Sequence, residues 1–237
     1  MKDGILLVRD KEGLYEEILI DIDYNGFSYD YEKNTTRQIS FTAFETKHNK
    51  FSYDLLTAES VVIYQEQEFV IKPFTPKTIG QMNTKEITAV HVSFTVRDHY
   101  QYNSKETSAS YTLDDIMQFA IGGNTLGFTY EIIGDFAKQT IESINNNDAS
   151  NLINDIACGV FGAIFYGDNK HLKLYSEKEW YREAQQTFRY LYNTNEVSAS
   201  FDTTNLKTYI KAYGKEKENK DTKSDSTISR SALTFNG

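Results

Sequence analysis

The sequence has little cysteine and little proline, and it has fewer basic than acidic residues. A single cysteine, Cys158, excludes an intramolecular disulfide framework and a cysteine-rich zinc site. The formal charge of -9 argues against a nucleic-acid-binding surface, which needs concentrated Lys and Arg. The apolar run at residues 5–8 is too short for a secretory core, and no run approaches the roughly 20 residues of a membrane helix. We therefore expect a soluble protein with no membrane span.

Aromatic residues are abundant, and their pattern favours β-sheet. They make up 14% of the 237 residues, and residues 5–72 alternate or run apolar in short segments. Asn25-Gly26 predicts a hairpin because both residues tolerate positive φ. Residues 65–67, between two apolar runs, predict a second tight hairpin. This part of the chain is expected to be all β, apart from a short turn near residues 53–59.

The only two prolines, Pro73 and Pro76, predict a domain boundary, since proline removes a donor from a strand ladder. A long strand is expected to follow over residues 85–102. One of its faces is uniformly apolar or β-branched and is predicted to be buried. That face consists of Thr88, Val90, Val92, Phe94 and Val96.

The middle of the chain is predicted to be mixed α/β, with its helical part at about residues 110–165. Thr112 and Asp115 form a capping box for a helix that ends at Gly122. Asp148 or Ser150 caps a second helix, whose apolar spacing continues through residues 152–157. A strand over residues 127–135 and a hairpin turning at 167–169 complete this region, and two further strands are expected at 187–214. The fold class is therefore α+β and β-rich.

The sequence offers no catalytic, cofactor-binding or metal-binding residues, and we expect a protein that is not an enzyme and needs no cofactor. Asp114 and Asp115 are explained by helix capping. The four histidines lack metal-ligand spacing; they are His48, His91, His99 and His171. Cys158 lies in an apolar helix and is expected to be buried and inert. The glycines of residues 121–127 follow a helix, not a strand, which argues against a phosphate loop.

An aromatic cluster near residue 180 leaves two interpretations open. Trp180, Tyr181, Tyr190 and Tyr192 could form a platform for a sugar. The alternative is a short helix followed by a strand whose aromatic residues pack on one face, and the spacing favours it.

The order of segments resembles the N-terminal hub region of the prophage endopeptidase tail family, the tail-associated lysins of phages of Gram-positive hosts. The resemblance rests on "TRQISFTAF", "LLTAESVVIYQEQEFVIK" and "VSASFDTTNLKTYIKAYGK", and it covers essentially the whole chain. The sharpest part is Asn205-Leu206-Lys207-Thr208 followed by Ala212-Tyr213-Gly214-Lys215.

This resemblance implies a multi-domain baseplate hub, with similar first and last β-barrels that alternate around a homotrimeric ring. Residues 1–74 would form the N-terminal barrel, residues 75–205 the lateral domains, and residues 206–237 a return strand, a charged loop and the start of the last barrel. The implied function is a structural hub that closes the tail tube, assembled in the bacterial cytoplasm and located at the tail tip of the virion. Its partners would be other copies, the distal tail and tape-measure proteins, and receptor-binding proteins. A carbohydrate-binding or cell-wall-hydrolysing tail module is the alternative, and the peptidoglycan hydrolase of the family would lie beyond residue 237.

The last 23 residues alternate cations and carboxylates before a new strand-like segment begins at residue 229. Residues 215–228 are nearly neutral and are expected to form a mobile, solvated loop. With the last barrel incomplete, we expect these 237 residues to fold but to form only a weak trimer or a monomer.

Overall fold

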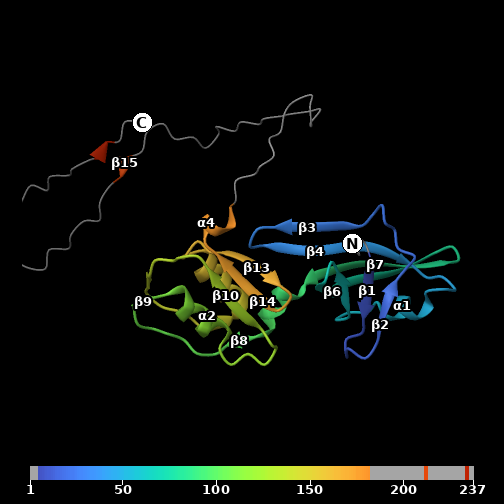
Figure 1. The fold of residues 1–237 in the computed structure, drawn as a ribbon, viewed down its shortest axis with the longest axis horizontal. Coiled ribbons are helices and arrows are strands. Elements are labelled where there is room, and N and C mark those ends of the chain that lie inside the picture. Colours follow the sequence, from blue (N-terminus) through green and yellow to red (C-terminus); the bar gives the residue numbers. More distant parts are fainter. Residues whose placement is uncertain (1–4, 182–210, 213–232, 235–237) are drawn as a thin grey trace, which may run out of the picture. The chain divides into compact units, whose positions relative to one another are not determined.

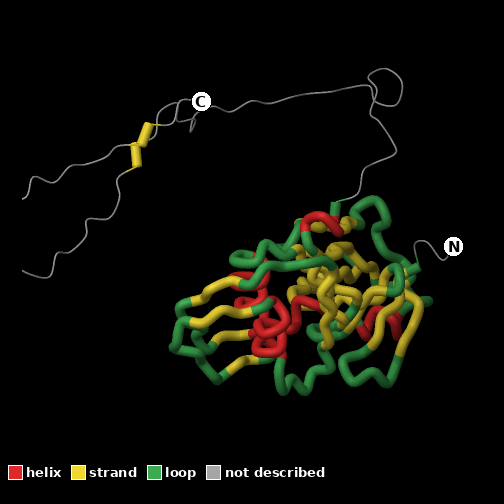
Figure 2. The backbone as a smooth tube through the Cα atoms, turned by 60° about the vertical axis from the view of Figure 1, so that its left-hand side comes forward, coloured by secondary structure: helices red, strands yellow, loops and turns green. Residues whose placement is uncertain are grey.

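The computed structural model describes residues 5–181, 211–212 and 233–234. The chain divides into two compact units, Met1–Glu183 and Ala184–Gly237, and each is described by itself. The first unit holds a large curled sheet and a smaller mixed α/β part (Figures 1 and 2). The fold is β-rich with few helices, as the sequence predicts.

The curled sheet is antiparallel throughout and has seven strands in the order β2-β1-β5-β6-β7-β4-β3. Its strands are β1 (Leu6–Arg9), β2 (Glu16–Leu19), β3 (Ser28–Glu32), β4 (Thr36–Phe44), β5 (Val61–Tyr64), β6 (Gln67–Ile79) and β7 (Met82–His91). The segment after β2 crosses to β4, where Asp23 N donates to Thr42 O at 2.8 Å and Phe44 N donates to Asp21 O at 2.9 Å. The sheet therefore curls into a half-barrel.

The concave face of the half-barrel is filled by aliphatic and aromatic side chains that alternate along each strand. They include Leu6, Val8, Leu19, Ile39, Phe41, Val62, Phe69, Ile71, Ile87 and Ala89. Helix α1 (Lys50–Leu55) covers part of this face, adding Tyr53 and the adjacent Leu56, which are both buried. This core gives the first sheet its own packed interior.

Of the two hairpins predicted within residues 5–72, one is correct. Gln65 and Glu66 join β5 to β6 with φ values of 50° and 64°, as a two-residue turn with both φ positive requires. Asn25-Gly26 does not join paired strands, because β2 and β3 lie at opposite ends of the sheet order. There Asp23 accepts a hydrogen bond from Asn25 N at 3.1 Å, a local turn that interrupts the strand running along β4.

The first sheet does not end at the prolines, where the sequence predicted a domain boundary. Pro73 and Pro76 both lie inside β6, and pairing with β7 carries the sheet on to His91 rather than ending it at residue 74. Strand β5 pairs with β6 only as far as Val70, so the prolines occupy a stretch with one open edge among the described strands. A register shift between Ile71 and Phe74 also accommodates Pro73. An edge and a bulge are where a sheet tolerates proline.

The predicted strand over residues 85–102 is also wrong in extent and in its buried face. Strand β7 ends at His91, and the chain continues as the 3₁₀ helix η1 (Val92–Asp98). Within β7, Ile87, Ala89 and His91 are buried, and they lie on the face opposite to the predicted one. Val92 and Val96 are buried as predicted, but they belong to the helix η1 and not to a strand. The β-branched residues favoured a strand, and the packing of η1 overrides that preference.

The mixed α/β part begins at η1 and is built around a three-stranded sheet in the order β10-β14-β13. The strands of the whole mixed part are β8 (Tyr100–Gln101), β9 (Ala109–Tyr111), β10 (Thr129–Ile133), β11 (Gln139–Ile141), β12 (Asn147–Asp148), β13 (Ile164–Asp168) and β14 (His171–Tyr175). Its helices are α2 (Leu113–Ile121), α3 (Ala149–Leu152), the π-helical turn η2 (Ile153–Cys158) and α4 (Glu177–Trp180). Strands β10 and β14 are parallel, whereas β13 and β14 form the predicted hairpin.

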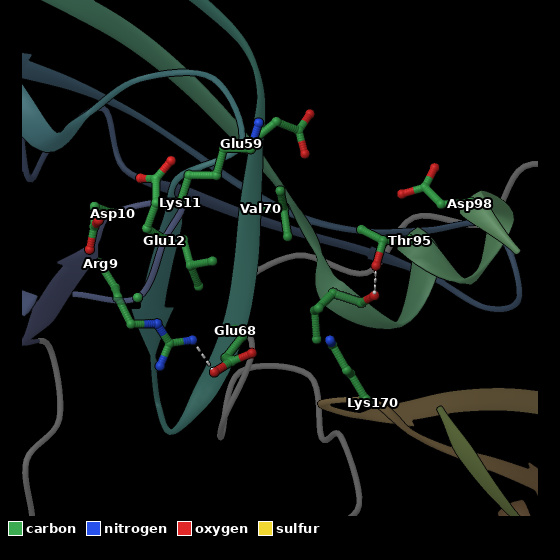
Figure 3. Close-up of a pocket in the computed structure, with 13 residues that line it drawn as sticks. Arg9, Asp10, Lys11, Glu12, Glu59, Glu68, Val70, Thr95, Asp98 and Lys170 are labelled. Carbon is green, nitrogen blue, oxygen red and sulfur yellow. Dashed lines mark hydrogen bonds and ion pairs between the residues drawn. The ribbon is translucent and has the colours of Figure 1, made fainter. Parts of the chain in front are cut away.

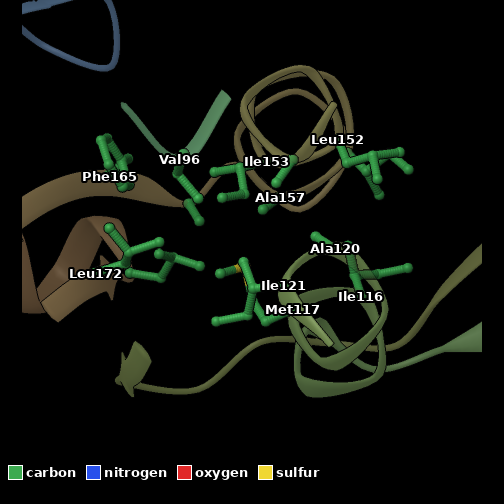
Figure 4. Packing of buried hydrophobic residues seen from close by; sticks show 14 of the residues in the cluster. Val96, Ile116, Met117, Ala120, Ile121, Leu152, Ile153, Ala157, Phe165 and Leu172 are labelled. Atoms are coloured by element: carbon green, nitrogen blue, oxygen red, sulfur yellow. The ribbon is translucent and has the colours of Figure 1, made fainter. Parts of the chain in front are cut away.

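A second hydrophobic core joins the helices of this part to its sheet (Figure 4). Residues from α2, the α3–η2 helix, η1 and the strands meet there; they include Val96, Ile116, Met117, Ala120, Ile153, Ala157, Phe165 and Leu172. The predicted capping box of α2 is confirmed, because Asp115 N donates to Thr112 Oγ1 at 3.1 Å and Thr112 N donates to Asp115 Oδ2 at 2.8 Å. Asp148 caps α3 through Asn151 N at 2.9 Å.

Little of the second unit is described. Strand β15 (Lys211–Ala212) pairs antiparallel with β16 (Leu233–Thr234), so the two segments that the sequence predicted as strands contact each other. The predicted mobile loop at 215–228 and the strands predicted between 187 and 210 lie outside the described residues. None of the helices that are described is long and apolar enough to cross a membrane.

Candidate functional site

The open edges of the half-barrel are its most accessible backbone surfaces. Strands β2 and β3 end the sheet, and residues 73–79 of β6 have a neighbour only on the β7 side among the described strands. An open edge presents unpaired N–H and C=O groups and can accept a strand from another chain. The side of β2 that faces away from β1 is partly occupied, because Asn49 Nδ2 donates to Ile20 O at 3.2 Å and the chain after β2 pairs with β4. Candidate assembly sites therefore lie at β3 and at residues 73–79 of β6.

Aliphatic side chains form a row on the convex face and run to the β2 edge. Ile63, Leu7 and Ile18 stand directly opposite one another on β5, β1 and β2. Ile18 is 56% exposed, and Ile5 and Ile20, beyond the paired residues of β1 and β2, are 48% and 39% exposed. Exposed apolar groups in a contiguous row are typical of an interaction surface.

A shallow hollow of about 490 Å³ lies beside this row, between the half-barrel and η1 (Figure 3). Charged side chains surround it, with five carboxylates and three cations; they are Asp10, Glu12, Glu59, Glu68 and Asp98, and Arg9, Lys11 and Lys170. Arg9 contacts Glu68 at its floor and Glu16 Oε2 at 3.7 Å. The hollow is open, and its lining shows no convergent catalytic groups.

A network that we call the polar clasp joins the half-barrel to the mixed α/β part. It consists of Asn34, Arg37, Gln67, His91, Gly167 and Asn169. Two turn asparagines with positive φ reach across in opposite directions. Asn34 receives a hydrogen bond from Phe165 N at 2.8 Å and donates to Ala163 O at 3.2 Å. Asn169 receives one from Glu68 N at 2.8 Å and donates to Glu66 O at 3.1 Å.

Arg37 is the buried charge of the polar clasp. It is 5% exposed, donates to Gly167 O at 2.6 Å and to Tyr29 OH at 2.9 Å, and lies 4.7 Å from the centre of the Tyr166 ring. A carbonyl, a hydroxyl and an aromatic face therefore take the place of a carboxylate partner. Arg37 holds the β13–β14 hairpin against β4.

His91 lies next to Arg37 and is fully buried. Its Nδ1 accepts a hydrogen bond from Ser93 N at 3.2 Å, and its Nε2 lies 3.0 Å from Gln67 Oε1, so the proton belongs on Nε2. Burial lowers the pKa of His91 to about 3, with Arg37 acting in the same direction and Asp168 against it. His91 is therefore a neutral structural residue.

The other residues considered from the sequence lie apart from one another in the described structure. His48 is exposed, His99 ends η1, and no described group of three or more His, Cys, Asp or Glu could hold a metal. Asp114 accepts from Tyr130 OH at 2.6 Å and does not pair with Asp115, which caps α2. Burial raises the pKa of Cys158 to about 11, as expected for an inert thiol.

Trp180 ends the short helix α4, which the second interpretation predicted, whereas the strand of that interpretation lies outside the described residues. Its ring centre lies 5.8 Å from that of Tyr166 and 5.3 Å from that of Tyr175, so it covers the outer face of the β13–β14 hairpin. Tyr181 is 56% exposed and accepts a hydrogen bond from Lys33 at 3.1 Å. Tyr190 and Tyr192 lie outside the described residues.

Replacing Trp180 with alanine is expected to lower the free energy of unfolding by about 2 kcal/mol, because a half-buried aromatic side chain loses its two ring contacts. Denaturant titration measures this change. Tyr181→Ala is the matched control and should change the stability by less than about 0.5 kcal/mol. A stable Trp180→Ala protein that loses binding to cell-wall glycans would instead favour the sugar platform.

One arrangement that the sequence did not reveal brings a hydroxyl, an imidazole and a carboxylate together. Thr129 Oγ1 lies 2.8 Å from His171 Nδ1, and His171 Nε2 lies 3.4 Å from Glu131 Oε2. Strands β10 and β14 place Thr129 and His171 opposite each other in parallel register. The order matches a nucleophile, a base and an orienting acid. However, the side chains of His171 and Glu131 are 38% and 53% exposed, unlike the sheltered groups of a catalytic triad.

Family models match three successive parts of the chain. The prophage endopeptidase tail N-terminal domain matches residues 6–91, which end where β7 ends. The prophage endopeptidase tail domain matches residues 98–174, and the prophage endopeptidase tail model matches residues 182–228. No curated protein matches the sequence significantly.

Among solved structures, prophage tail protein gp18 from Listeria monocytogenes EGD-e has a TM-score of 0.75 and 29% sequence identity, over 98% of this chain and 67% of that chain. A tail protein from Neisseria meningitidis MC58 has a TM-score of 0.46 and 11% identity, over 72% of this chain and 49% of its own. The 43 kDa tail protein of prophage MuSo2 from Shewanella oneidensis has a TM-score of 0.48 and 9% identity, over 72% of this chain and 54% of its own. The last two similarities are too weak to carry an argument.

Proposed function

Because the chain belongs to the prophage endopeptidase tail family and is a phage tail protein, we propose that it is the hub of the tail tip. In this role it closes the tail tube and connects the tube to the distal attachment or lysin parts. The observation that carries the proposal is the match to the Listeria tail protein along 98% of this chain. The fold supplies a rigid structural body, since the polar clasp fixes the half-barrel to the mixed part.

The hub is proposed to be a homotrimeric ring around a central channel. A curled sheet with open edges suits a ring, because neighbouring copies or domains can continue its ladders. The net charge of -9 fits a channel that the genome passes without binding to phosphate-neutralising residues. The proposed partners are the distal tail protein, the tape-measure protein and receptor-binding proteins. Assembly is proposed to take place in the host cytoplasm.

Deleting the gene from an inducible prophage tests the hub. We expect induced cells to release particles without a completed tail tip, and a plasmid copy to restore infectious virions. Infectious virions with complete tails that lack the protein would contradict the proposal. A copy carrying Tyr181→Ala, which leaves the packing of the sheet intact, controls for expression of the plasmid gene.

The trimer is tested separately by multi-angle light scattering on residues 1–237. We expect a monomer or a trimer that dissociates at micromolar concentration, because the ring contacts require more sheet than the half-barrel supplies. A tight trimer would show that the half-barrel alone closes the ring. A stable dimer would contradict the three-fold arrangement.

Cell-wall hydrolysis is the alternative function, and the Thr129, His171 and Glu131 arrangement is the observation that favours it. We propose that these residues are structural, since His171 and Glu131 are solvent-exposed. Zymography on purified cell walls is expected to show no clearing by the chain. Clearing that is lost in both Thr129→Val and His171→Gln, but not in His48→Gln, would overturn this view.

A further inference from the structure

The half-barrel and the mixed α/β part have separate interiors and meet across a polar junction. Their two hydrophobic cores share no residue. Within residues 5–181 the chain passes between the two parts once, where β7 ends at His91 and η1 begins at Val92. Most side-chain hydrogen bonds across the junction belong to the polar clasp. Separating the two parts would therefore break the clasp and leave both cores packed.

His91 lies at this crossing point and is enclosed by both parts. Its Nδ1 caps η1 by accepting a hydrogen bond from Ser93 N at 3.2 Å, and its Nε2 donates to Gln67 Oε1 at 3.0 Å. Strand β13 closes over the ring, because a Cβ on Gly167 would lie only 3.1 Å from His91 Cε1. Since the side chain is fully buried, the imidazole meets water only when the mixed part moves away.

Four elements pack against the imidazole ring and present two charges and three uncharged groups to it. They are Arg37 on β4, Asp168 on β13, Gln67 and Phe69 on β6, and Ser93 on η1. The Asp168 carboxylate already binds Lys173 Nζ at 2.9 Å and Gln67 Nε2 at 3.1 Å, and its side chain is 46% exposed. A cation on His91 would therefore be repelled by Arg37 more than it is attracted by Asp168.

We propose that protonation of His91 opens the junction, so that acid releases the mixed part from the half-barrel while each part stays folded. In the closed junction a protonated Nδ1 becomes a donor, and the Ser93 N–H loses its acceptor even if Ser93 Oγ, at 2.8 Å, takes the new hydrogen bond. The added charge also lies out of contact with water beside Arg37. Moving β13 away about the crossing at residues 91–92 hydrates both cations.

The junction stays closed near neutral pH and opens as the pH falls. The pKa of His91 is about 3 while burial keeps the ring dry, and it returns toward 6.5 once the ring is hydrated. The open form therefore binds one more proton than the closed form between these values, and each pH unit lost between about pH 6 and pH 4 should favour opening about tenfold. Lys173 and Gln67 lower the pKa of Asp168 below its usual range, so that carboxylate keeps its charge across this window.

Amide hydrogen exchange of the whole chain, resolved by NMR between about pH 6 and pH 4, tests the opening of the junction. Two amides report the junction, because Phe165 N donates to Asn34 Oδ1 and Glu68 N donates to Asn169 Oδ1, each at 2.8 Å. Their protection, corrected for the pH dependence of intrinsic exchange, should fall about tenfold per pH unit. Protection that does not change with pH would overturn the proposal.

Two core amides separate opening of the junction from unfolding of the whole protein. Ile71 N donates to Ser60 O within the half-barrel, and Ile144 N donates to Lys105 O within the mixed part, each at 2.8 Å. At every pH these amides should be at least about tenfold better protected than the junction amides, and low urea should accelerate their exchange alone, since opening the junction exposes little surface. Equal protection and equal urea dependence for the two pairs would show global unfolding and would overturn the proposal.

Variants assign the opening to His91. His91→Gln keeps an acceptor for Ser93 N but does not titrate, so the junction amides should lose their pH dependence, whereas the exposed His48→Gln should behave as the unmodified protein. Asn34→Ala should lower the protection of the distant Glu68 N by the same factor at every pH, because the junction opens as one unit. A pH dependence that survives His91→Gln, or a Glu68 amide that Asn34→Ala leaves unchanged, would overturn the proposal.

If His91→Gln does not fold, the urea dependence of the unmodified protein and the Asn34→Ala comparison still decide. The outcome does not depend on the proposed hub, because every contact concerned lies within residues 5–181 of one chain.

Discussion

Replacing Gly167 with alanine is expected to lower the free energy of unfolding by about 3 kcal/mol. A Cβ at this position would overlap the Cβ and Oγ atoms of Ser93 and lie 3.1 Å from His91 Cε1. Ser93 and His91 are both fully buried, so neither can move into solvent to relieve the clash. The substitution also displaces the Gly167 carbonyl, which accepts a hydrogen bond from Arg37. Denaturant titration measures the effect.

Two further variants separate the clash at Gly167 from general effects of alanine. Gly162→Ala has no atom within 4 Å of the added Cβ but has a φ of 70°, so it should cost only about 1 kcal/mol. Ser93→Gly in the Gly167→Ala background should recover part of the loss, since it removes the atoms that clash. A loss that is equal in Gly167→Ala and Gly162→Ala, with no recovery in the double variant, would contradict the close packing of the polar clasp.

Acidification is expected to weaken the protein through His91, by about 4 kcal/mol between pH 7 and pH 3. The pKa of His91 is about 3 in the folded protein and near its ordinary value of 6.5 in the unfolded chain. Between these values the unfolded state binds a proton that the folded state does not, so stability falls as the pH falls below 6.5 and levels off below 3. Protonation would place a hydrogen on Nδ1, which faces the backbone N–H of Ser93.

The contribution of His91 to the pH dependence is measured against His91→Gln, which cannot titrate. The stability difference between the two proteins should shrink or reverse from pH 7 to pH 3, whereas His48→Gln should follow the unmodified protein. A carboxylate whose pKa is lowered in the fold and that lies away from His91, such as Asp115, adds the same acid sensitivity to every variant and cancels in the comparison. Parallel curves for His91→Gln and the unmodified protein would contradict a buried neutral imidazole.

Local signals in the sequence predicted the elements whose chemistry is local. The capping box of Thr112 and Asp115, the hairpin at Gln65 and Glu66, and the turn after β13 each depend on a few adjacent residues. The domain boundary predicted from the prolines failed because a strand tolerates proline where it has an open edge, and the order of strands decides where that is. The predicted length of β7 was wrong for a similar reason, since the tertiary packing of η1 overrides the strand preference of its residues.

The polar clasp could not be read from the sequence. Asn34 and Asn169 look like ordinary turn residues, and their contacts lie more than a hundred residues away along the chain. The alternating pattern predicts burial for Val90 and Val92, which leaves His91 on the other face of the strand, yet His91 is fully buried. The family resemblance, in contrast, depended on segment order and was confirmed.

Gold-labelled antibody against this chain, imaged by electron microscopy on intact virions from the induced prophage, tests the hub most directly. The account predicts label at the end of the tail distal to the capsid, on every intact particle and absent from particles of the deletion strain. Label on the capsid or along the tail tube, or virions without any label despite detection of the protein in lysates, would contradict it.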